Sequence, residues 1–476
     1  MTEKYWSEKE SEQEFDPIGS LLSEWSDPEE EEEEFRSDFF QGLDGRRKKA
    51  AFVLMAIWGI VLTLHLVSWG YLVVLILTGL VGIHAFRLSI AQPELPPTSL
   101  SDRDLASAPK VSLLVAAKNE EAVIGKLLEQ LCALDYPTEQ YEVWAIDDHS
   151  SDRTPEILAR LAPKYPQLKV VHRPANAGGG KSGALNQVLS QTQGEIIGVF
   201  DADAGVTSDL LRRVVPMFAS AEMGAVQVRK AIANAEENFW TKGQAAEMAL
   251  DSYIQQQRIA LGGIGELRGN GQFVRRSALE RCGRWNEETI TDDLDLTIRL
   301  HLDNWKIGFL MFPSVQEEGV VKASSLWHQR NRWAEGGYQR YLDYWRYLFH
   351  SPMGLSKRFD LLTFILLQYI LPTACVPDLI MATIRHHFIL LSPLSGVLFF
   401  FAYLGMFRGL LRTRTKQELN LFDLISIAWQ SLRGLIYMLH WQIIMPCITA
   451  RMSIRPKRLK WVKTVHEGAG TESFEY

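Results

Sequence analysis

Cysteine is scarce in this sequence, and its spacing excludes two classes of site. The 476 residues include four cysteines, Cys132, Cys282, Cys375 and Cys447. They are scattered, without the paired spacing of a zinc site or a small disulfide framework. This usage is typical of a protein kept in a reduced compartment.

The start of the chain lacks the apolar run of a secretory signal, because the first such stretch begins only near Ala50. Residues 1–45 instead carry sixteen acidic and three basic residues, a local charge of −13. Since the whole chain has a formal charge of −7, the remainder is basic, at about +6. A run of like charges repels itself and buries no core. We therefore expect residues 1–45 to form a disordered acidic arm, and a regulatory or partner-binding arm is the alternative.

Charged residues are absent from two adjoining stretches, Ala50–Trp69 and Gly70–Phe86. Each stretch is about long enough to cross a hydrocarbon core of roughly 30 Å. The basic cluster at 46–49 precedes them, and basic flanks stay on the cytoplasmic side. The sequence therefore predicts a transmembrane hairpin at 46–88 with both ends in the cytoplasm.

A second apolar block, 360–450, predicts further membrane helices. Leu361–Ile384 and Phe388–Phe407 are long enough for another hairpin. Asp378 lies inside the first of them, where a carboxylate either faces a cavity with a function or serves as a structural partner. The sequence leaves both roles open.

Residues 421–450 are apolar but contain Arg433, His440 and Gln442. A further span here would place the basic tail, 451–476, outside, against the usual charge distribution. We therefore expect an interfacial or re-entrant segment.

The block 108–335 predicts an α/β domain with a mainly parallel sheet. Strand patterns alternate with helical stretches, of which Asn119–Leu134 is the first. In such sheets ligands gather at the carboxyl ends of the strands. The predicted strands are Val111–Ala116, Glu142–Ile146, Lys169–His172 and Glu195–Phe200.

Asp201 and Asp203 follow the last of these strands. Two carboxylates at this spacing can hold a hard divalent cation against a diphosphate, whose growing charge the cation neutralises. Asp148 also ends a strand, where it can accept hydrogen bonds from a nucleotide. Lys181 follows Gly178-Gly179-Gly180, but Ala175 stands where a P-loop requires glycine, so this turn predicts phosphate attraction and not an ATPase.

Two further motifs supply acid–base and binding groups. Thr291-Asp292-Asp293 offers Asp293 as a general base for an acceptor hydroxyl, although Asp also favours a helix start. Gln329, Arg332 and Trp333 can hydrogen-bond, stabilise a diphosphate and stack on a sugar, or they can form an amphipathic interface helix. The aromatic stretch 336–355 that follows suits a membrane surface.

Taken together, these residues resemble the family 2 glycosyltransferases of the GT-A fold. The matching motifs, in order, are Glu120 after the first strand, Asp147-Asp148, Asp201-x-Asp203, Thr291-Asp292-Asp293 and Gln329-x-x-Arg332-Trp333. The resemblance covers about 108–335.

The resemblance implies an inverting, UDP-sugar-dependent hexosyltransferase that needs Mg²⁺ or Mn²⁺. It implies that Glu120 and Asp148 bind the nucleotide, that Asp201 and Asp203 hold the diphosphate and metal, and that Asp293 is the base. The family commonly has Glu-Asp where this chain has Asp292-Asp293, which leaves the base in place.

Within the family, the layout is similar to cyanobacterial enzymes that move glucose from UDP-glucose to diacylglycerol. This likeness implies a multi-pass enzyme of the plasma or thylakoid membrane that makes a β-linked glucolipid on the cytoplasmic side. The alternative is a processive polysaccharide synthase of the cellulose or hyaluronan type, which shares the Gln-x-x-Arg-Trp motif. A catalytically dead membrane scaffold is a third interpretation, which the intact acids disfavour.

Overall fold

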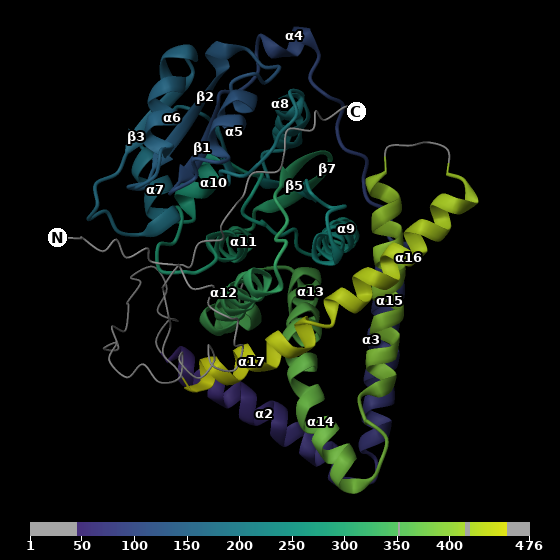
Figure 1. The fold of residues 1–476 in the computed structure, drawn as a ribbon. Coiled ribbons are helices and arrows are strands. Elements are labelled where there is room, and N and C mark those ends of the chain that lie inside the picture. Colours follow the sequence, from purple (N-terminus) through teal and green to yellow (C-terminus); the bar gives the residue numbers. More distant parts are fainter. Residues whose placement is uncertain (1–44, 351–352, 415–418, 455–476) are drawn as a thin grey trace, which may run out of the picture. The chain divides into compact units, whose positions relative to one another are not determined.

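The computed structural model describes residues 45–350, 353–414 and 419–454. The acidic arm, apart from Gly45, and the basic tail beyond Ile454 lie outside the described residues. A seven-stranded sheet occupies the middle of the chain, and long apolar helices precede and follow it (Figure 1).

The sheet has the order β3-β2-β1-β4-β6-β5-β7, and β6 is antiparallel to both of its neighbours. The other pairings are parallel, which confirms the predicted mainly parallel sheet. The strands are β1 Val111–Ala117, β2 Tyr141–Asp147, β3 Leu168–His172, β4 Ile196–Phe200, β5 Met223–Ile232, β6 Gln272–Arg275 and β7 Lys306–Glu317.

Helices cover both faces of the sheet, because its strands are apolar on both sides. Leu113 and Val115 of β1 pack with residues of α5, α6 and α8 on one face. Leu114 packs with residues of α7, α10 and α11 on the other. This two-sided burial is typical of parallel sheets. The helices of this block are α4 Asp102–Leu105, α5 Ile124–Leu131, α6 Thr154–Leu161, α7 Gly180–Leu189, α8 Leu210–Val214, α9 Phe239–Ala260, α10 Arg276–Arg281, α11 Asp292–Leu302 and α12 Ala323–His350.

The helix predicted over Asn119–Leu134 is shorter than expected, because α5 begins only at Ile124. Asn119 has a positive φ of 55°, and its N–H donates to Ser150 Oγ at 2.9 Å. The N–H of Glu120 likewise donates to Thr154 Oγ1 at 2.8 Å. These side-chain acceptors hold the segment as a loop against the turn after β2.

Four described helices are long and apolar enough to cross a membrane, in agreement with the four spans expected. They are α2 Arg46–Leu66, α3 Gly70–Ile90, the element Leu355–Arg385 formed by α13 Leu355–Ile365, a π-helical turn Leu366–Ile370 and α14 Leu371–Arg385, and α15 Ser392–Thr413. The sharp turn between α2 and α3 depends on Gly70, where a Cβ would lie 1.8 Å from the Leu64 carbonyl oxygen.

Asp378 is a structural partner, which decides between the two roles left open for it. Its side chain is fully buried, and Oδ1 contacts His65 Nε2 of α2 at 2.8 Å. The N–H groups of Leu390 and Leu391 donate to Oδ1 at 2.9 Å and Oδ2 at 2.8 Å. Asp378 therefore fastens the turn between α14 and α15 to α2.

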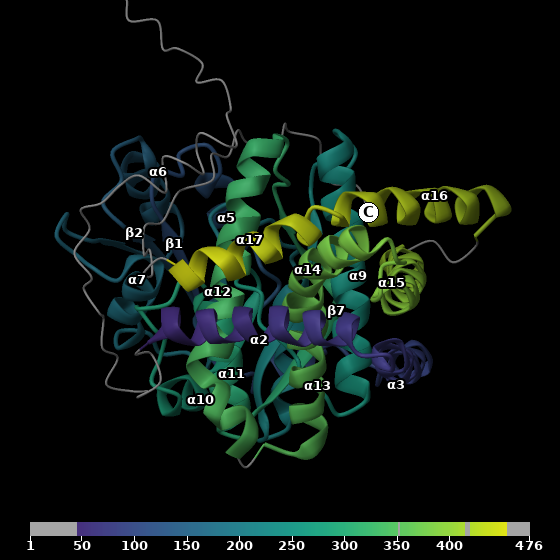
Figure 2. The same cartoon turned by 90° about the horizontal axis from the view of Figure 1, so that it is seen from below.

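Helices α16 Leu421–Met438 and α17 Trp441–Ile454 are not among the candidate spans. In Figure 2, α3 and α15 are seen end-on, whereas α16 and α17, like α2, lie lengthwise across the view. One side of α16 exposes apolar residues three or four positions apart, which suits the interfacial segment expected here. These residues are Leu421, Ile425, Trp429, Leu432 and Ile436.

The aromatic stretch of α12 differs from the expectation for a membrane surface. Tyr338, Tyr341 and Tyr344 are buried, and only the later aromatics, such as Trp345, are exposed. Tyr338 stacks on Tyr369 with ring centroids 5.4 Å apart. The tyrosines face inward because the helix is continuous from Ala323 and is packed against α11, α13 and α17.

Candidate active site

The acidic motifs meet at the edge of the sheet where its parallel strands end. Ala117, the last residue of β1, pairs with Asp147, the last of β2. Val115 of β1 pairs with Phe200, the last of β4. The segments that follow these strands, including Asp201, therefore leave the sheet side by side, as predicted for a parallel α/β sheet.

A glycine loop joins this edge because β6 runs antiparallel and begins there. The N–H of Gly271 donates to Val199 O of β4 at 3.0 Å. The N–H of Asp201 donates to Asn270 Oδ1 at 3.3 Å. The loop 269–271 is thus tied directly to the start of the Asp201–Asp203 motif.

Asp148 is paired with a base that sequence reasoning missed. Arg173 is buried, and its Nη1 donates to Asp148 Oδ1. Its Nη2 donates to Gly178 O at 2.6 Å, so Arg173 ties Asp148 to the glycine-rich turn. Arg173 directly follows β3, whose last residue pairs with Asp147, and this register was the available signal. A nucleotide-binding role for Asp148 and for half-buried Glu120 stays a prediction.

Lys181 lies at the same edge and neutralises one of the two acids. It is the second residue of α7, and its Nζ donates to Asp201 Oδ1 at 2.5 Å. Burial alone lowers the pKa of Lys181, but the carboxylates of Asp201 and Asp292 outweigh it and raise this pKa above its usual value. Lys181 therefore remains charged, as a phosphate-attracting group must.

Asp201 and Asp203 offer a donor set that suits a divalent cation. The Asp201 side chain retains 42% of its exposure, and Asp203 Oδ2 accepts the N–H of Glu318 at 3.3 Å. In the part of the chain that is described, no three His, Cys, Asp or Glu side chains are grouped to hold a metal ion. Two carboxylates at this spacing fit a cation that completes its shell with diphosphate oxygens and water.

Asp293 has the electrostatic environment expected of a base. It lies in the first turn of α11, where its Oδ1 accepts the N–H of Leu294 at 2.8 Å. Burial raises the pKa of Asp293 to about 6, and the neighbouring carboxylate of Asp292 adds to the effect. A base with a pKa just below neutral is ionised at pH 7 and still accepts a proton readily.

Space beside Asp293 is kept open by Gly269. This glycine has φ +80°, and a Cβ on it would come within 3.4 Å of Asp293 Oδ2. Asp292 is more enclosed, because its Oδ2 is buried without a hydrogen-bond partner among the described residues. Burial also raises the pKa of Asp292 above its usual value, while Lys181 opposes the shift.

The Gln329, Arg332 and Trp333 side chains come from α12, two turns from its start. Burial lowers the pKa of Arg332, and Asp201 is the charge that acts against this shift. The Trp333 ring centroid lies 5.3 Å from Lys230 Nζ. Gln329 Oε1 is buried and accepts no hydrogen bond within the described ranges, so it is available to a ligand.

Arg330, inside the same motif, has a structural role. It is buried, and its Nη2 donates to Glu247 Oε2 at 2.6 Å and to Tyr437 Oη at 3.1 Å. Glu247 belongs to α9, and Tyr437 to α16. Arg330 thus joins the Gln329-x-x-Arg332-Trp333 motif to α9 of the sheet domain and to α16.

Two more cations near the site carried no motif in the sequence. Lys230 of β5 pairs with Glu317 at 2.8 Å; burial alone would lower the pKa of Lys230, but Glu317, helped by Asp201 and Asp293, raises it above its usual value. Arg268 pairs with Asp251 at 2.6 Å and acts to lower the pKa of Asp293. Lys230 and Arg268 are recognised by their carboxylate partners in the folded structure. The one signal in the sequence is that Arg268 directly precedes the loop 269–271.

Comparison with known proteins gives the family. Residues 112–283 match the family model for glycosyl transferase family 2. The chain is 61% identical to the β-monoglucosyldiacylglycerol synthase of Synechocystis sp., over 98% of this chain and 97% of that protein. It is 59% identical to the synthase of that name from Trichormus variabilis, over 99% of this chain and all of that protein. This chain belongs to the family 2 glycosyltransferases.

The fold agrees with that membership. A mannosyltransferase from Pyrobaculum calidifontis, solved with GDP-Man and Mn²⁺, superposes with a TM-score of 0.53. The superposition covers 80% of this chain and 99% of the mannosyltransferase at 20% sequence identity. This family 2 glycosyltransferase therefore has a GT-A type sheet domain, flanked by four long apolar helices.

Proposed function

We propose that this chain transfers one glucose from UDP-glucose to diacylglycerol and so makes β-monoglucosyldiacylglycerol. The observation that carries the proposal is the identity of about 60% to β-monoglucosyldiacylglycerol synthases over nearly the whole of both chains. Because the likeness includes the apolar helices as well as the sheet domain, it favours a lipid acceptor over the growing chain of a polysaccharide synthase.

The donor is proposed to lie across the carboxyl edge of the sheet. Asp148 and Glu120 would face the nucleotide, and Lys181 and Arg332 would face the diphosphate. Asp201 and Asp203 would hold Mg²⁺ or Mn²⁺, which when bound neutralises charge on the departing diphosphate. The support for this assignment is that Lys181, Arg332 and Asp292 all interact electrostatically with Asp201 or with one another.

Asp293 is the proposed base. It would take the proton of the acceptor hydroxyl as the oxygen attacks the anomeric carbon from the face opposite the leaving UDP, which inverts that centre. Its position in the first turn of α11 beside Gly269 leaves an approach for the hydroxyl. Gln329 and Trp333 would orient the sugar through the free amide oxygen and the indole ring.

A bilayer acceptor is supported by the helices that adjoin the site. The α12 helix carries Gln329, Arg332 and Trp333 and packs against α2, α13 and α17. Diacylglycerol can present its hydroxyl at headgroup depth while its tails stay in the membrane. We further propose that α2, α3, α13–α14 and α15 span the bilayer, with the sheet domain on the cytoplasmic side.

A donor panel tests the proposal. Membranes containing the enzyme are incubated separately with radiolabelled UDP-glucose, UDP-galactose and GDP-mannose, and the organic extract is separated by chromatography. Membranes with Asp293→Asn are the matched control. We expect one labelled glycolipid, from UDP-glucose only and absent in the variant. Label from another donor alone would overturn the donor assignment, and label in an insoluble polymer would overturn the lipid acceptor.

A further inference from the structure

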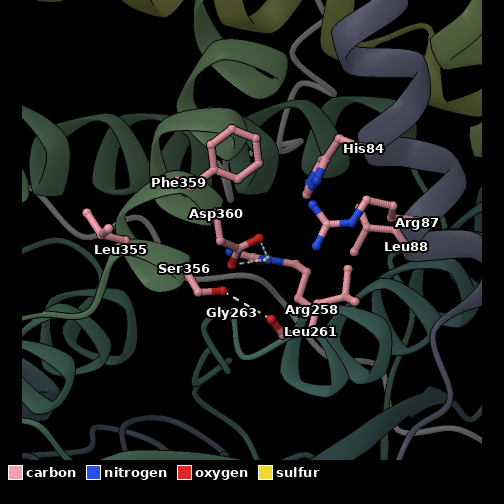
Figure 3. Close-up of a pocket in the computed structure, with 10 residues that line it drawn as sticks. All are labelled: His84, Arg87, Leu88, Arg258, Leu261, Gly263, Leu355, Ser356, Phe359 and Asp360. Atoms are coloured by element: carbon pink, nitrogen blue, oxygen red, sulfur yellow. Dashed lines mark hydrogen bonds and ion pairs between the residues drawn. The ribbon is translucent and has the colours of Figure 1, made fainter.

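A cavity of about 310 Å³ lies where α3, α9 and α13 meet (Figure 3). None of the residues assigned to the active site lines it. Its volume is at the lower end of the range for small-molecule sites. The position is a joint between the sheet domain and the apolar helices, because α9 packs on both β5 and α3.

The lining of this cavity is basic. His84 and Arg87 lie three residues apart on α3, so they share one face of the helix. Arg258 comes from α9 and Asp360 from α13, and Arg258 Nε donates to the two Asp360 oxygens at 3.1 and 2.9 Å. Asp360, the one carboxylate in the lining, is thus paired with Arg258. The positive charge of Arg87 is not balanced by a carboxylate of the lining.

The side chains of Arg87 and His84 point toward the middle of the cavity in Figure 3. Within the described ranges, Arg87 forms neither a hydrogen bond nor an ion pair through its side chain. A guanidinium that has no carboxylate partner can bind two oxygens of one phosphate at the same time. Arg87 is therefore suited to bind a phosphate in this cavity.

Buried polar atoms without hydrogen-bond partners give an independent sign of a ligand. Arg258 is 2% exposed, yet its Nη2 donates no hydrogen bond to any described residue. Its Nη1 forms an ion pair with Glu266, whose Oε2 lies 3.6 Å away, so Nη2 is the group left without a partner. His84 Nδ1 is buried without a partner as well. Buried polar atoms are normally satisfied, so Arg258 Nη2 and His84 Nδ1 are two positions at which the cavity offers hydrogen bonds to a ligand.

The surroundings of the cavity indicate that this acceptor carries apolar tails. Ile83 and Phe86, beside the basic residues on α3, are 62% and 56% exposed. Leu355 and Phe359 of α13, which line the cavity, are 79% and 52% exposed. Such apolar side chains next to a basic pocket are typical of the depth at which lipid headgroups lie.

We propose that this cavity binds the phosphate headgroup of an anionic membrane lipid. The phosphate oxygens accept from the Arg87 guanidinium, from Arg258 Nη2 and, in the tautomer protonated at Nδ1, from His84, while the acyl chains lie along α3 and α13. Bound there, the lipid holds α3 and α13 against α9. Diacylglycerol, the acceptor of the proposed reaction, is uncharged and would form no ion pair with these residues. The cavity is therefore a second lipid site, separate from the acceptor site.

Lipid selectivity of the full-length enzyme in phosphatidylcholine vesicles tests the proposal, without any sugar donor. The probe is spin-labelled phosphatidylglycerol, compared with spin-labelled phosphatidylcholine, and the readout is the fraction of each held immobile by the protein. Arg87→Gln removes the cation, Arg87→Lys keeps the charge, and Lys48→Gln is the matched control, since Lys48 is an exposed base at the start of α2.

We expect the wild type to prefer phosphatidylglycerol and Arg87→Gln to hold it about tenfold more weakly, as for a lost charge-assisted hydrogen bond. Arg87→Lys should retain most of the preference and Lys48→Gln all of it. Equal retention of both probes by the wild type, or an unchanged preference in Arg87→Gln, would overturn the proposal. Inorganic phosphate should not displace the lipid; displacement would show a site for a free anion and not for a lipid.

Discussion

Asp378, inside the apolar helices, and Asp293, at the edge of the sheet, are both carboxylates shielded from water, but their partners differ. Asp378 accepts from two backbone N–H groups and contacts His65. Asp293 accepts from the N–H of Leu294, and burial raises its pKa to about 6. A carboxylate whose oxygens already accept several hydrogen bonds from the protein has little capacity to bind a ligand. A carboxylate that accepts few hydrogen bonds can still take a proton from one.

The largest expected effect is that of removing the base. Asp293→Asn should lower turnover by about 10²–10⁴-fold, because the amide cannot accept the acceptor's proton. Donor binding should persist, since the assigned donor-binding groups are unchanged. Initial rates of glycolipid formation and calorimetric titration with UDP-glucose measure the two quantities. Near wild-type turnover would remove Asp293 from this role and erase its contrast with Asp378.

The second largest effect is expected from removal of the metal ion. Excess chelator should lower activity about 100-fold, because the Asp201 and Asp203 carboxylates repel a diphosphate without a cation between them. Added Mg²⁺ or Mn²⁺ should restore the wild type but only partly restore Asp203→Ala. Asp378→Asn should respond to chelator as the wild type does. Full activity in chelator would contradict the assignment of the Asp201–Asp203 motif.

The acid side of the pH profile follows from the pKa of Asp293, which burial raises to about 6. The base works only when deprotonated, so kcat/KM should be steady above this pH and fall as pH drops through it. The decrease should be about tenfold per pH unit well below the pKa. Asp378→Asn should keep the same profile, and a midpoint near the usual value for an aspartate would argue against a raised pKa.

The smallest effect on chemistry is expected for Asp378→Asn itself. The amide leaves a buried N–H of Leu390 or Leu391 poorly matched, which costs about 1–3 kcal/mol of stability. The thermal midpoint in detergent should fall while the specific activity of the folded fraction stays close to wild type. A loss of activity without a loss of stability would give Asp378 a functional role after all.

Much of the sheet domain could be predicted, because its strands are continuous apolar runs. The ends of β1 to β4 agree with the predicted ranges to within one residue. Local signals failed where tertiary partners decide the outcome. Asn119 leaves the helical pattern because Ser150 accepts its N–H, and Tyr344 turns inward because its hydroxyl donates to Asp295 at 2.7 Å.

The positions of the acidic residues could be predicted from the sequence, whereas two of the basic residues beside them could not. Acidic residues in a short motif directly after a strand pattern can be recognised in the sequence. Asp201 and Asp203 form such a motif, and they lie at the predicted edge of the sheet. Arg173 offered only its position directly after β3, and Lys230 is recognised only by its carboxylate partner in space. A basic residue at the end of a strand is common on protein surfaces, so sequence alone gives little reason to choose it.

The most direct test of the account is the product of the purified enzyme in detergent, given UDP-glucose and diacylglycerol. The proposed chemistry expects one lipid product carrying a single glucose, whose anomeric configuration by proton NMR is β, opposite to that of the donor. Asp293→Asn should form none of it, and Asp378→Asn should form it normally. Polymer made without added lipid, an α-linked product or sugar that never reaches a lipid would each contradict the account.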